Sequence, residues 1–245
     1  MLTDREWDQY RRQLPLLGEE GQERIRETWL CIGGAGGLGC TIALQAAFAG
    51  FGRITLIDHD VVEVHNLNRQ VLFREEDIGR PKVAAATDRL DGINPDLRAE
   101  GRRERITADS ADGLIAGHDI VLDAMDNYEA RFLLHNACQR AGIPFIHGAV
   151  HGFYGQVSTI IPGESTCLHC LVPGPPSGEA VPILGMTAGT VGCIQSTEAL
   201  KIATGTGTPL AGRLLLWDGR AGEAEVMAVR NNPGCPWCGS DGHGD

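Results

Sequence analysis

The chain alternates short apolar runs with longer amphipathic stretches, a pattern typical of strands and helices in turn. Mainly apolar runs at 29–32, 53–57 and 119–123 are each followed by glycine, alanine or aspartate, and they predict buried strands of a parallel sheet. Helices are expected after the first and third runs, over 41–49 and 128–141. The first half of the chain therefore predicts strand–turn–helix–strand units with sharp turns at the strand ends.

The second half of the chain has a different pattern. Residues 151–161 alternate between apolar and polar, which predicts an antiparallel strand or hairpin. A Pro- and Gly-rich stretch at 172–178 predicts a mobile crossing loop, followed by a helix at 191–203. The remaining expected elements are helices at 1–28, 82–93 and 109–116 and strands at 98–106, 144–147, 213–218 and 224–230.

These elements together predict an α/β fold with a Rossmann-like doubly wound sheet. The parallel N-terminal half, 1–150, is expected to continue into a mixed or antiparallel C-terminal half, 151–245. The sequence shows no internal repeat and no obvious linker. We therefore expect the two halves to form a single domain spanning 1–245.

Composition narrows the possible partners. The net charge of −11 argues against broad binding to nucleic acid or to an anionic membrane, although a local basic pocket remains compatible with it. No apolar run approaches the ~20 residues that a membrane span needs. The first residues lack the apolar segment of a signal peptide, so a cytoplasmic location is expected. Glycine makes up 33 of 245 residues, which indicates many tight turns and close backbone approaches.

One of these turns has the spacing of a nucleotide-binding loop. Gly34, Gly36 and Gly39 follow the first strand and precede a helix, where glycine lets the backbone approach phosphate and the helix N-terminus supplies N–H donors. Asp58 ends the next strand, where a carboxylate can accept hydrogen bonds from ribose hydroxyls. The pattern predicts adenine-nucleotide binding and leaves NAD and ATP as alternatives.

Charged residues near the same strand ends favour ATP. A nucleotidyl transferase must neutralise a triphosphate and its transition state, whereas a hydride-transfer enzyme needs few positive charges. Arg69 and Lys82 follow the second strand and could hold phosphates, and Asp126 follows the third strand and could hold Mg²⁺. Each of these residues alone could be ordinary surface charge.

Four of the eight cysteines form two CxxC pairs. Cys167, Cys170, Cys235 and Cys238 predict a tetrahedral Cys₄ zinc site of structural type, and His169 inside the first pair is left out of the ligand set. A redox CxxC is the alternative, but it lacks the expected strand-to-helix setting. The other four, in apolar surroundings, are expected to be buried thiols: Cys31, Cys40, Cys138 and Cys193.

Taken together, these motifs resemble the ubiquitin-activating-enzyme-like adenylyltransferases, in particular the ThiF/MoeB/HesA group. The similar segments occur in family order over nearly the whole chain. They are YRRQ (10–13), GGAGGLG (33–39), LIDHDVVEVHNLNRQ (56–70), GRPKV (79–83), INP (93–95), DIVLDAMDN (119–127), CLHC (167–170), EALKIATG (198–205) and NPGCPWCG (232–239).

The resemblance implies roles for matching positions. Asp58 would bind the ATP ribose with Gly37 close by, and the pocket would be lined by Asp60, Asn66, Arg69 and Lys82. Asp126 would ligate Mg²⁺ with Asn127 beside it. Arg12 would reach the ATP site of a partner subunit, which implies a homodimer with shared active sites.

The resemblance also implies a reaction. A carboxylate oxygen attacks the α-phosphate of ATP, which releases pyrophosphate and leaves an acyl-adenylate for sulfur transfer in cofactor biosynthesis. The usual substrate in the family is the C-terminal glycine of a small ubiquitin-like sulfur carrier. Two other functions stay open: adenylation of a small-molecule carboxylate, and a non-catalytic nucleotide-binding module that docks a partner. A nicotinamide dehydrogenase is disfavoured by the same charged residues.

One family feature is missing. Many relatives carry an acyl-accepting cysteine in the crossover loop, where this chain has Val181. Cys193 is the nearest alternative, but it is expected inside the following helix, facing the core. The chain is therefore expected to stop at adenylation and to pass the adenylate to a separate sulfur donor or nucleophile, which also weakens the case for a protein substrate.

Overall fold

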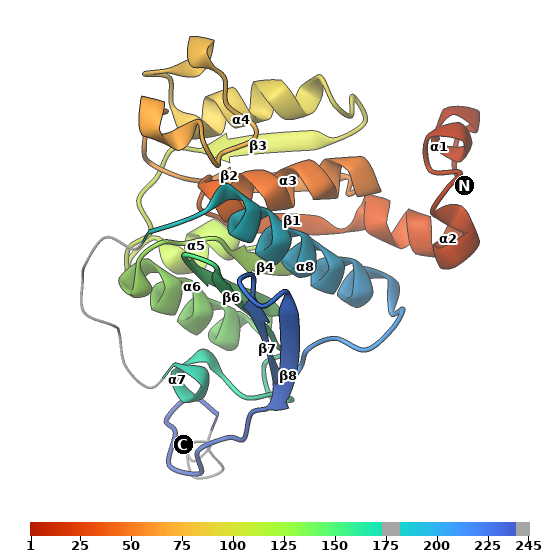
Figure 1. Cartoon of the computed structure of the whole chain (residues 1–245). Coiled ribbons are helices and arrows are strands. Elements are labelled where there is room, and N and C mark those ends of the chain that lie inside the picture. Colours follow the sequence, from red (N-terminus) through yellow and green to blue (C-terminus); the bar gives the residue numbers. More distant parts are fainter. Residues whose placement is uncertain (173–181, 239–245) are drawn as a thin grey trace.

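The computed structural model describes residues 1–172 and 182–238, and within them one continuous sheet contains eight strands. The order across the sheet is β3-β2-β1-β4-β5-β6-β7-β8. The strands are β1 (Trp29–Gly33), β2 (Arg53–Ile57), β3 (Arg98–Arg102), β4 (Ile120–Asp123), β5 (Phe145–His151), β6 (Tyr154–Ile160), β7 (Arg213–Asp218) and β8 (Glu223–Ala228). The first five pair in parallel and the last three antiparallel, which confirms the predicted fold class (Figure 1).

Helices cover the parallel part of the sheet on both faces. One core packs α3 (Gly37–Ala49), α4 (Lys82–Asp91) and α8 (Gly185–Thr204) against the sheet, and a second core packs α5 (Ala111–Ile115) and α6 (Tyr128–Ala141). Alternate residues of β1 enter the two cores, Ile32 in the first and Cys31 in the second. The predicted apolar runs are therefore strands buried on both faces. Short elements are η1 (Val64–Asn66), η2 (Glu75–Asp77) and α7 (Leu168–Leu171).

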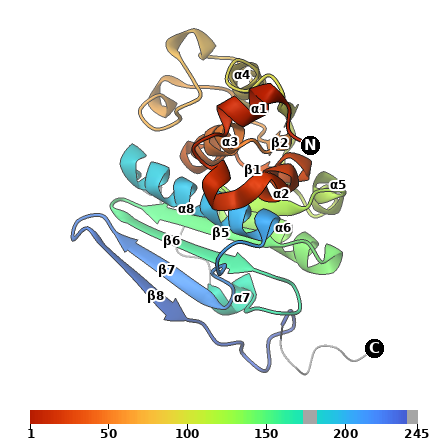
Figure 2. The same cartoon turned by 90° about the vertical axis from the view of Figure 1, so that its right-hand side faces the viewer.

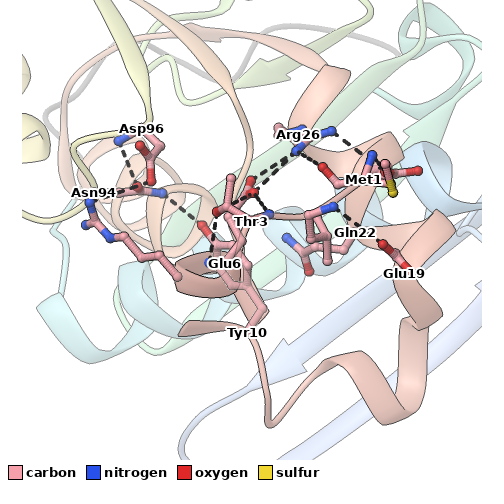
Figure 3. Close-up of polar contacts among 12 residues, drawn as sticks. Met1, Thr3, Glu6, Tyr10, Glu19, Gln22, Arg26, Asn94 and Asp96 are labelled. Carbon is pink, nitrogen blue, oxygen red and sulfur yellow. Dashed lines mark hydrogen bonds and ion pairs between the residues drawn. The ribbon is translucent and has the colours of Figure 1, made fainter. Parts of the chain in front are cut away.

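The N-terminal segment forms two helices rather than one, α1 (Asp4–Gln9) and α2 (Leu14–Glu27). Thr3 caps α1, while Gly18 has a left-handed φ of 71° that kinks α2. Figure 3 shows how polar contacts hold this segment: Asn94 donates to the Tyr10 hydroxyl oxygen (3.1 Å), and Glu6 pairs with Arg26 (3.2 Å). The YRRQ and INP segments thus meet in space.

Helix α8 begins at Gly185, six residues before the predicted start. Two of its glycines allow close packing against neighbouring segments. A Cβ on Gly192 would lie 2.8 Å from Thr41 Cβ, and one on Gly185 would lie 2.8 Å from the Asn68 carbonyl oxygen. Tertiary packing therefore overrides the low helix propensity of glycine here. Strand β3 is also shorter than predicted and ends at Arg102.

Among the described residues, no helix combines the length and the hydropathy that crossing a membrane would require.

Candidate active site

A cleft of about 1220 Å³ opens at the carboxyl ends of the parallel strands. Strand ends and the turns that follow them supply most of its polar lining, as expected for a ligand site in a doubly wound sheet. Ten predicted residues line it: Gly34, Gly36, Gly37, Asp58, Asp60, Asn66, Arg69, Lys82, Asp126 and Asn127. Two predicted residues, Gly39 and Arg12, are not part of its lining.

The glycine turn combines exposed and packed positions. Gly36 is the N-cap of α3, and a Cβ there would meet nothing within 4 Å. Gly39 has another role, because a Cβ on it would lie only 1.9 Å from the Gly34 carbonyl oxygen. The first part of the turn therefore exposes backbone N–H groups at a helix N-terminus, and Gly39 permits the packing that closes the turn.

Asp58 connects β2 to this turn. One carboxylate oxygen accepts a hydrogen bond from the Ala35 N–H (2.8 Å), and the other accepts one from the Asp60 N–H (2.9 Å). These bonds fix the carboxylate at the cleft wall beside the glycine loop, where a ribose would lie in a nucleotide-binding fold of this kind.

Lys82 lies at the start of α4 and places a buried charge beside two carboxylates. Its Nζ lies 3.1 Å from Asp60 Oδ2 and 3.9 Å from Asp58 Oδ2. Burial acts to raise the pKa of Asp60, but the hydrogen bond and the charge of Lys82 outweigh it and lower that pKa. The cleft thus carries a fixed ammonium group that a phosphate could engage.

Arg69 and Asn66 occupy the loop around η1. Asn66 Oδ1 accepts from the Glu63 N–H (3.0 Å), so this buried side chain shapes the loop. Arg69 donates to the His65 carbonyl oxygen (2.6 Å) and to Asn68 Oδ1 (3.0 Å). The guanidinium is therefore held by its own loop at the edge of the cleft.

Asp126 and Asn127 follow β4. The Asn127 side chain caps α6 by accepting from the Ala130 N–H (2.9 Å). Asp126 is exposed in the cleft, and its Oδ1 accepts a 3.4 Å hydrogen bond from Asn127 Nδ2. An exposed carboxylate oxygen in a polar cleft is a suitable ligand for Mg²⁺, so Asp126 fits this ion.

Beneath Asp126 lies a buried ionic network that sequence reasoning missed. Asp123 Oδ2 is 2.8 Å from both Arg131 Nε and His147 Nδ1, and all three side chains are at most 4% exposed. Burial acts to raise the pKa of Asp123, but the Arg131 charge and the bond from His147 lower it. In the sequence these residues lie inside a strand, a helix and another strand, so only the strand register brings them together.

The four predicted zinc ligands converge at the C-terminal end of the described chain. All four Sγ atoms lie within 4.8 Å of one another, and the Cys167–Cys235 and Cys170–Cys238 pairs are both 3.5 Å apart. A tetrahedral site with Zn–S bonds of about 2.3 Å has edges of about 3.8 Å, whereas a disulfide needs about 2.05 Å. The arrangement therefore fits zinc and does not fit disulfides.

Backbone N–H groups contact the sulfur atoms of Cys170 and Cys235. The Asn232 N–H donates to Cys170 Sγ (3.4 Å). Burial acts to raise the pKa of Cys235, but the N–H groups of Trp237 and Cys238 lower it to about 7. Burial raises the pKa of Cys167 and of Cys170, so the donors favour the thiolate, the form that binds zinc, at Cys235.

His169 lies outside the group of four cysteines and joins that group to α6. Its ring stacks on Trp237 (centroids 5.4 Å apart) and on Phe132 (4.5 Å), and its Nε2 is bonded to Asn136 Oδ1 (2.8 Å). The CxxC segment therefore packs on α6, the helix that Asn127 caps.

The remaining cysteines correct one expectation. Cys31, Cys40 and Cys138 are buried as predicted, and burial raises the pKa of the first two thiols to about 12. Cys193 lies in α8 but is exposed, so the expectation of a core position is wrong. Its neighbours in sequence are apolar, yet the side chain lies at the surface. Val181 lies outside the described residues, as does most of the predicted crossing loop.

Solved structures share this architecture. Escherichia coli MccB crystallised with MccA-N7isoASN has a TM-score of 0.86 at 20% identity and covers 96% of this chain and 75% of that chain. PaaA has a TM-score of 0.81 at 24% identity, covering 93% of this chain and 75% of that one. At such identities the likeness supports the fold alone.

Sequence comparisons reach further. The chain is 40% identical over 243 residues to the SAMP-activating enzyme E1 of Haloferax volcanii, covering 96% of this chain and 90% of that protein. It is also 40% identical over 252 residues to the sulfur carrier protein adenylyltransferase of Thermus thermophilus, with 98% and 93% covered. The ThiF family matches residues 10–237. The chain belongs to the ThiF family.

Proposed function

We propose that this chain is an ATP-dependent adenylyltransferase that activates the C-terminal carboxylate of a small ubiquitin-like sulfur-carrier protein. The observation that carries the proposal is the convergence of Asp58, Arg69, Lys82 and Asp126 on the glycine turn in one cleft. The names of the two relatives at 40% identity, a SAMP-activating enzyme and a sulfur carrier protein adenylyltransferase, support a protein acceptor.

Each cleft residue receives a role in binding ATP. Asp58 accepts hydrogen bonds from the ribose hydroxyls, and the N–H groups near Gly36 and Gly37 face the phosphates. Lys82 and Arg69 neutralise the phosphate oxygens, while Asp60 holds the Lys82 ammonium in place. Asn66 and Asn127 shape the two loops that carry Arg69 and Asp126.

The reaction is a direct displacement at phosphorus. An acceptor carboxylate oxygen forms a bond to the α-phosphorus, the bond from that phosphorus to the oxygen bridging the α- and β-phosphates breaks, and pyrophosphate leaves with the electron pair. The carboxylate is already ionised at neutral pH, so no residue has to remove a proton. Asp126 would hold Mg²⁺, which supplies charge neutralisation on the phosphates. The protein itself aligns the two substrates and stabilises negative charge.

The two halves of the chain divide this work. We assign nucleotide binding to residues 1–150, and acceptor binding and zinc to 151–245. The zinc ion has a structural role in this scheme, since four cysteines complete its shell and leave no open position. Because Cys193 is exposed and is not part of the cleft lining, a separate sulfur donor or nucleophile takes the acyl group.

Arg12 completes the site from a second copy of the chain. It is exposed in the turn between α1 and α2 and does not line the cleft of its own chain. The contacts of Tyr10 with Asn94 and of Gln13 with Gln22 (2.6 Å) fix the segment on either side of it. This placement supports a homodimer in which each Arg12 reaches the other subunit's ATP.

ATP–pyrophosphate exchange tests the reaction. Exchange that requires a carrier ending in Gly-Gly is the expected result, and a carrier lacking its last glycine is the matched control. Exchange with small carboxylic acids alone would replace the protein acceptor by a small molecule. Bound ATP without exchange for any carboxylate would refute the adenylation proposal.

Mixing of subunits tests the shared site. Arg12→Ala and Asp126→Asn are each expected to be inactive, but a re-equilibrated equal mixture should regain roughly a quarter of wild-type exchange, because half the dimers then carry one intact site. No recovery, with dimers shown by light scattering to exchange subunits, would place Arg12 outside the partner's site.

A further inference from the structure

A continuous chain of polar side chains leads from the buried end of β4 to the lining of the cleft. Asp123, at the end of β4, and His147, on β5, are both 0% exposed and are joined through Oδ2 and Nδ1 at 2.8 Å. His147 Nε2 is in turn 3.0 Å from Nε2 of Gln156 on β6. Three neighbouring strands thus contribute one residue each.

The hydrogen-bond directions in this chain are defined. Burial lowers the pKa of His147, so the ring is neutral and carries one N–H. Because an amide N–H of Gln156 can only donate, His147 Nε2 accepts it, and His147 Nδ1–H donates to Asp123. The ring therefore links Gln156 to Asp123 in a single tautomer.

One end of the chain controls the loop that carries Asp126. Asp123 Oδ1 accepts from the Met125 N–H (3.1 Å), and Arg131 Nη2 donates to the Met125 carbonyl oxygen (2.5 Å). The peptide groups on both sides of Met125 are therefore fixed by the buried ion pair. Asp126 itself has only its contact with Asn127 among the described residues, so its position depends on this support.

The other end reaches the acceptor wall. Gln156 lines the cleft together with Tyr154 and His151, on the antiparallel pair β5 and β6, which lies beyond β4 from the strand that leads into the glycine turn. The same His147 ring thus contacts the residue that supports the Asp126 loop and a residue of the wall beside which an acceptor carboxylate would lie.

We propose that Gln156, His147, Asp123 and Arg131 form a positioning relay that aligns the Asp126 loop with the acceptor wall of the cleft. The role of the relay at the acceptor wall rests on the proposed function. Its role at the Asp126 loop concerns only the binding of Mg²⁺ and ATP. None of its four residues takes part in bond making; each acts through Met125 or through the cleft wall.

Two substitutions of His147 separate the two ends. His147→Asn places an amide near the Nδ1 position, so it keeps a donor for Asp123 and loses the contact with Gln156. His147→Gln places its amide near the Nε2 position, so it keeps the contact with Gln156 and loses the donor to Asp123. The two variants introduce the same amide group on side chains that differ in length by one methylene, so each serves as the control for the other.

The measurements are the Mg²⁺ concentration at half-saturation of ATP binding, read by calorimetry without acceptor, and the acceptor KM in pyrophosphate exchange. We expect His147→Gln to raise the Mg²⁺ requirement about tenfold or more, as loss of support behind a metal ligand does. We expect His147→Asn to change the Mg²⁺ requirement by no more than about threefold and to raise the acceptor KM. Gln156→Leu should raise the acceptor KM by the same factor, and the double variant should raise it no further than either single variant.

Several outcomes would overturn the relay. The first is an unchanged Mg²⁺ requirement in His147→Gln. The second is that both His147 variants change the Mg²⁺ requirement and the acceptor KM by equal factors. The third is that the increases in acceptor KM from His147→Asn and Gln156→Leu are fully additive in the double variant. If His147→Gln does not fold, Arg131→Lys replaces it, because it keeps the charge beside Asp123 and removes the Nη2 bond to Met125; an unchanged Mg²⁺ requirement there overturns the relay as well. Wild-type protein that binds Mg²⁺–ATP without exchanging pyrophosphate refutes the proposed function, and the Mg²⁺ measurement still decides the Asp126 end.

Discussion

Lys82 donates a 3.1 Å hydrogen bond to Asp60, although the lysine is buried and the aspartate is half exposed. The pair holds the ammonium group at the start of α4, close to the glycine turn, before any phosphate arrives. A charge that is already in place loses little side-chain entropy when it binds an anion. This pair is therefore a sensitive place to test the phosphate site.

Lys82→Met should reduce pyrophosphate exchange by about 10²-fold or more, since it removes the charge and leaves Asp58 and Asp60 facing the phosphates. Asp60→Asn should have a smaller effect, because it loosens the ammonium group without removing it. The control is Arg74→Met, which removes an exposed charge paired with Glu76. Exchange in Lys82→Met equal to that of Arg74→Met would exclude a phosphate role for Lys82.

Asp126→Asn should abolish Mg²⁺-dependent exchange with little change in thermal stability, because the side chain is exposed and has few contacts. Circular dichroism melting and exchange at several Mg²⁺ concentrations measure the two effects. Asp91→Asn, an exposed carboxylate at the end of α4, controls for the loss of one charge. Turnover near the wild-type value in Asp126→Asn would assign Mg²⁺ to another group.

The two ends of the glycine turn should respond differently to one methyl group. Gly39→Ala forces its Cβ against the Gly34 carbonyl oxygen, and overpacking against a backbone atom costs about 1–3 kcal/mol or more of unfolding free energy. Gly36→Ala meets an open space, and the loss of glycine at this N-cap should cost less than about 1 kcal/mol. Denaturant unfolding monitored by tryptophan fluorescence gives both values; equal values would contradict the packing role of Gly39.

Zinc should be present at one ion per chain and should depend on the four clustered cysteines. Cys238→Ser is expected to lose the metal and to lower the melting temperature, since removal of a ligand disrupts the contact of Trp237 with His135 of α6. Cys193→Ser, an exposed cysteine outside the cluster, should keep the full complement. Elemental analysis of the purified proteins decides, and equal zinc content in both variants would exclude a site at Cys238.

His118 should make the fold less stable in mild acid. Its Nδ1–H donates to the Ile115 carbonyl oxygen (3.1 Å), its Nε2 accepts from the Thr55 hydroxyl (2.8 Å), and burial lowers its pKa. The unfolded chain therefore binds more protons than the folded chain as the pH falls below about 6.5, so the free energy of unfolding decreases.

The test compares wild type with His118→Gln at pH 7.5 and pH 5.5. Other buried histidines contribute equally to both proteins, so the variant should lose less stability between these pH values. An identical loss of stability in the two proteins would show that the pKa of His118 is the same in the folded and unfolded states.

Features encoded by local spacing could be predicted from the sequence. The glycine turn, Asp58 at the strand end and the two CxxC pairs each follow from short-range geometry. The network of Asp123, His147 and Arg131 could not be predicted, because it depends on which strands pair and in which register. The early start of α8 could not be predicted for a related reason: glycine has a low helix propensity, and Gly185 packs against Asn68 and Arg69, which are far from it in the sequence.

Strand β5 pairs in parallel with β4 on one side. On its other side it pairs antiparallel with β6, so the chain reverses direction without leaving the sheet (Figure 2). The Asp126 loop follows β4, and Gln156 lies near the start of β6, at the same end of the sheet. Two strand spacings amount to about 10 Å. The separation between the Asp126 loop and the acceptor wall is thus fixed by the backbone hydrogen bonds of the sheet, and it does not depend on the closing of two domains.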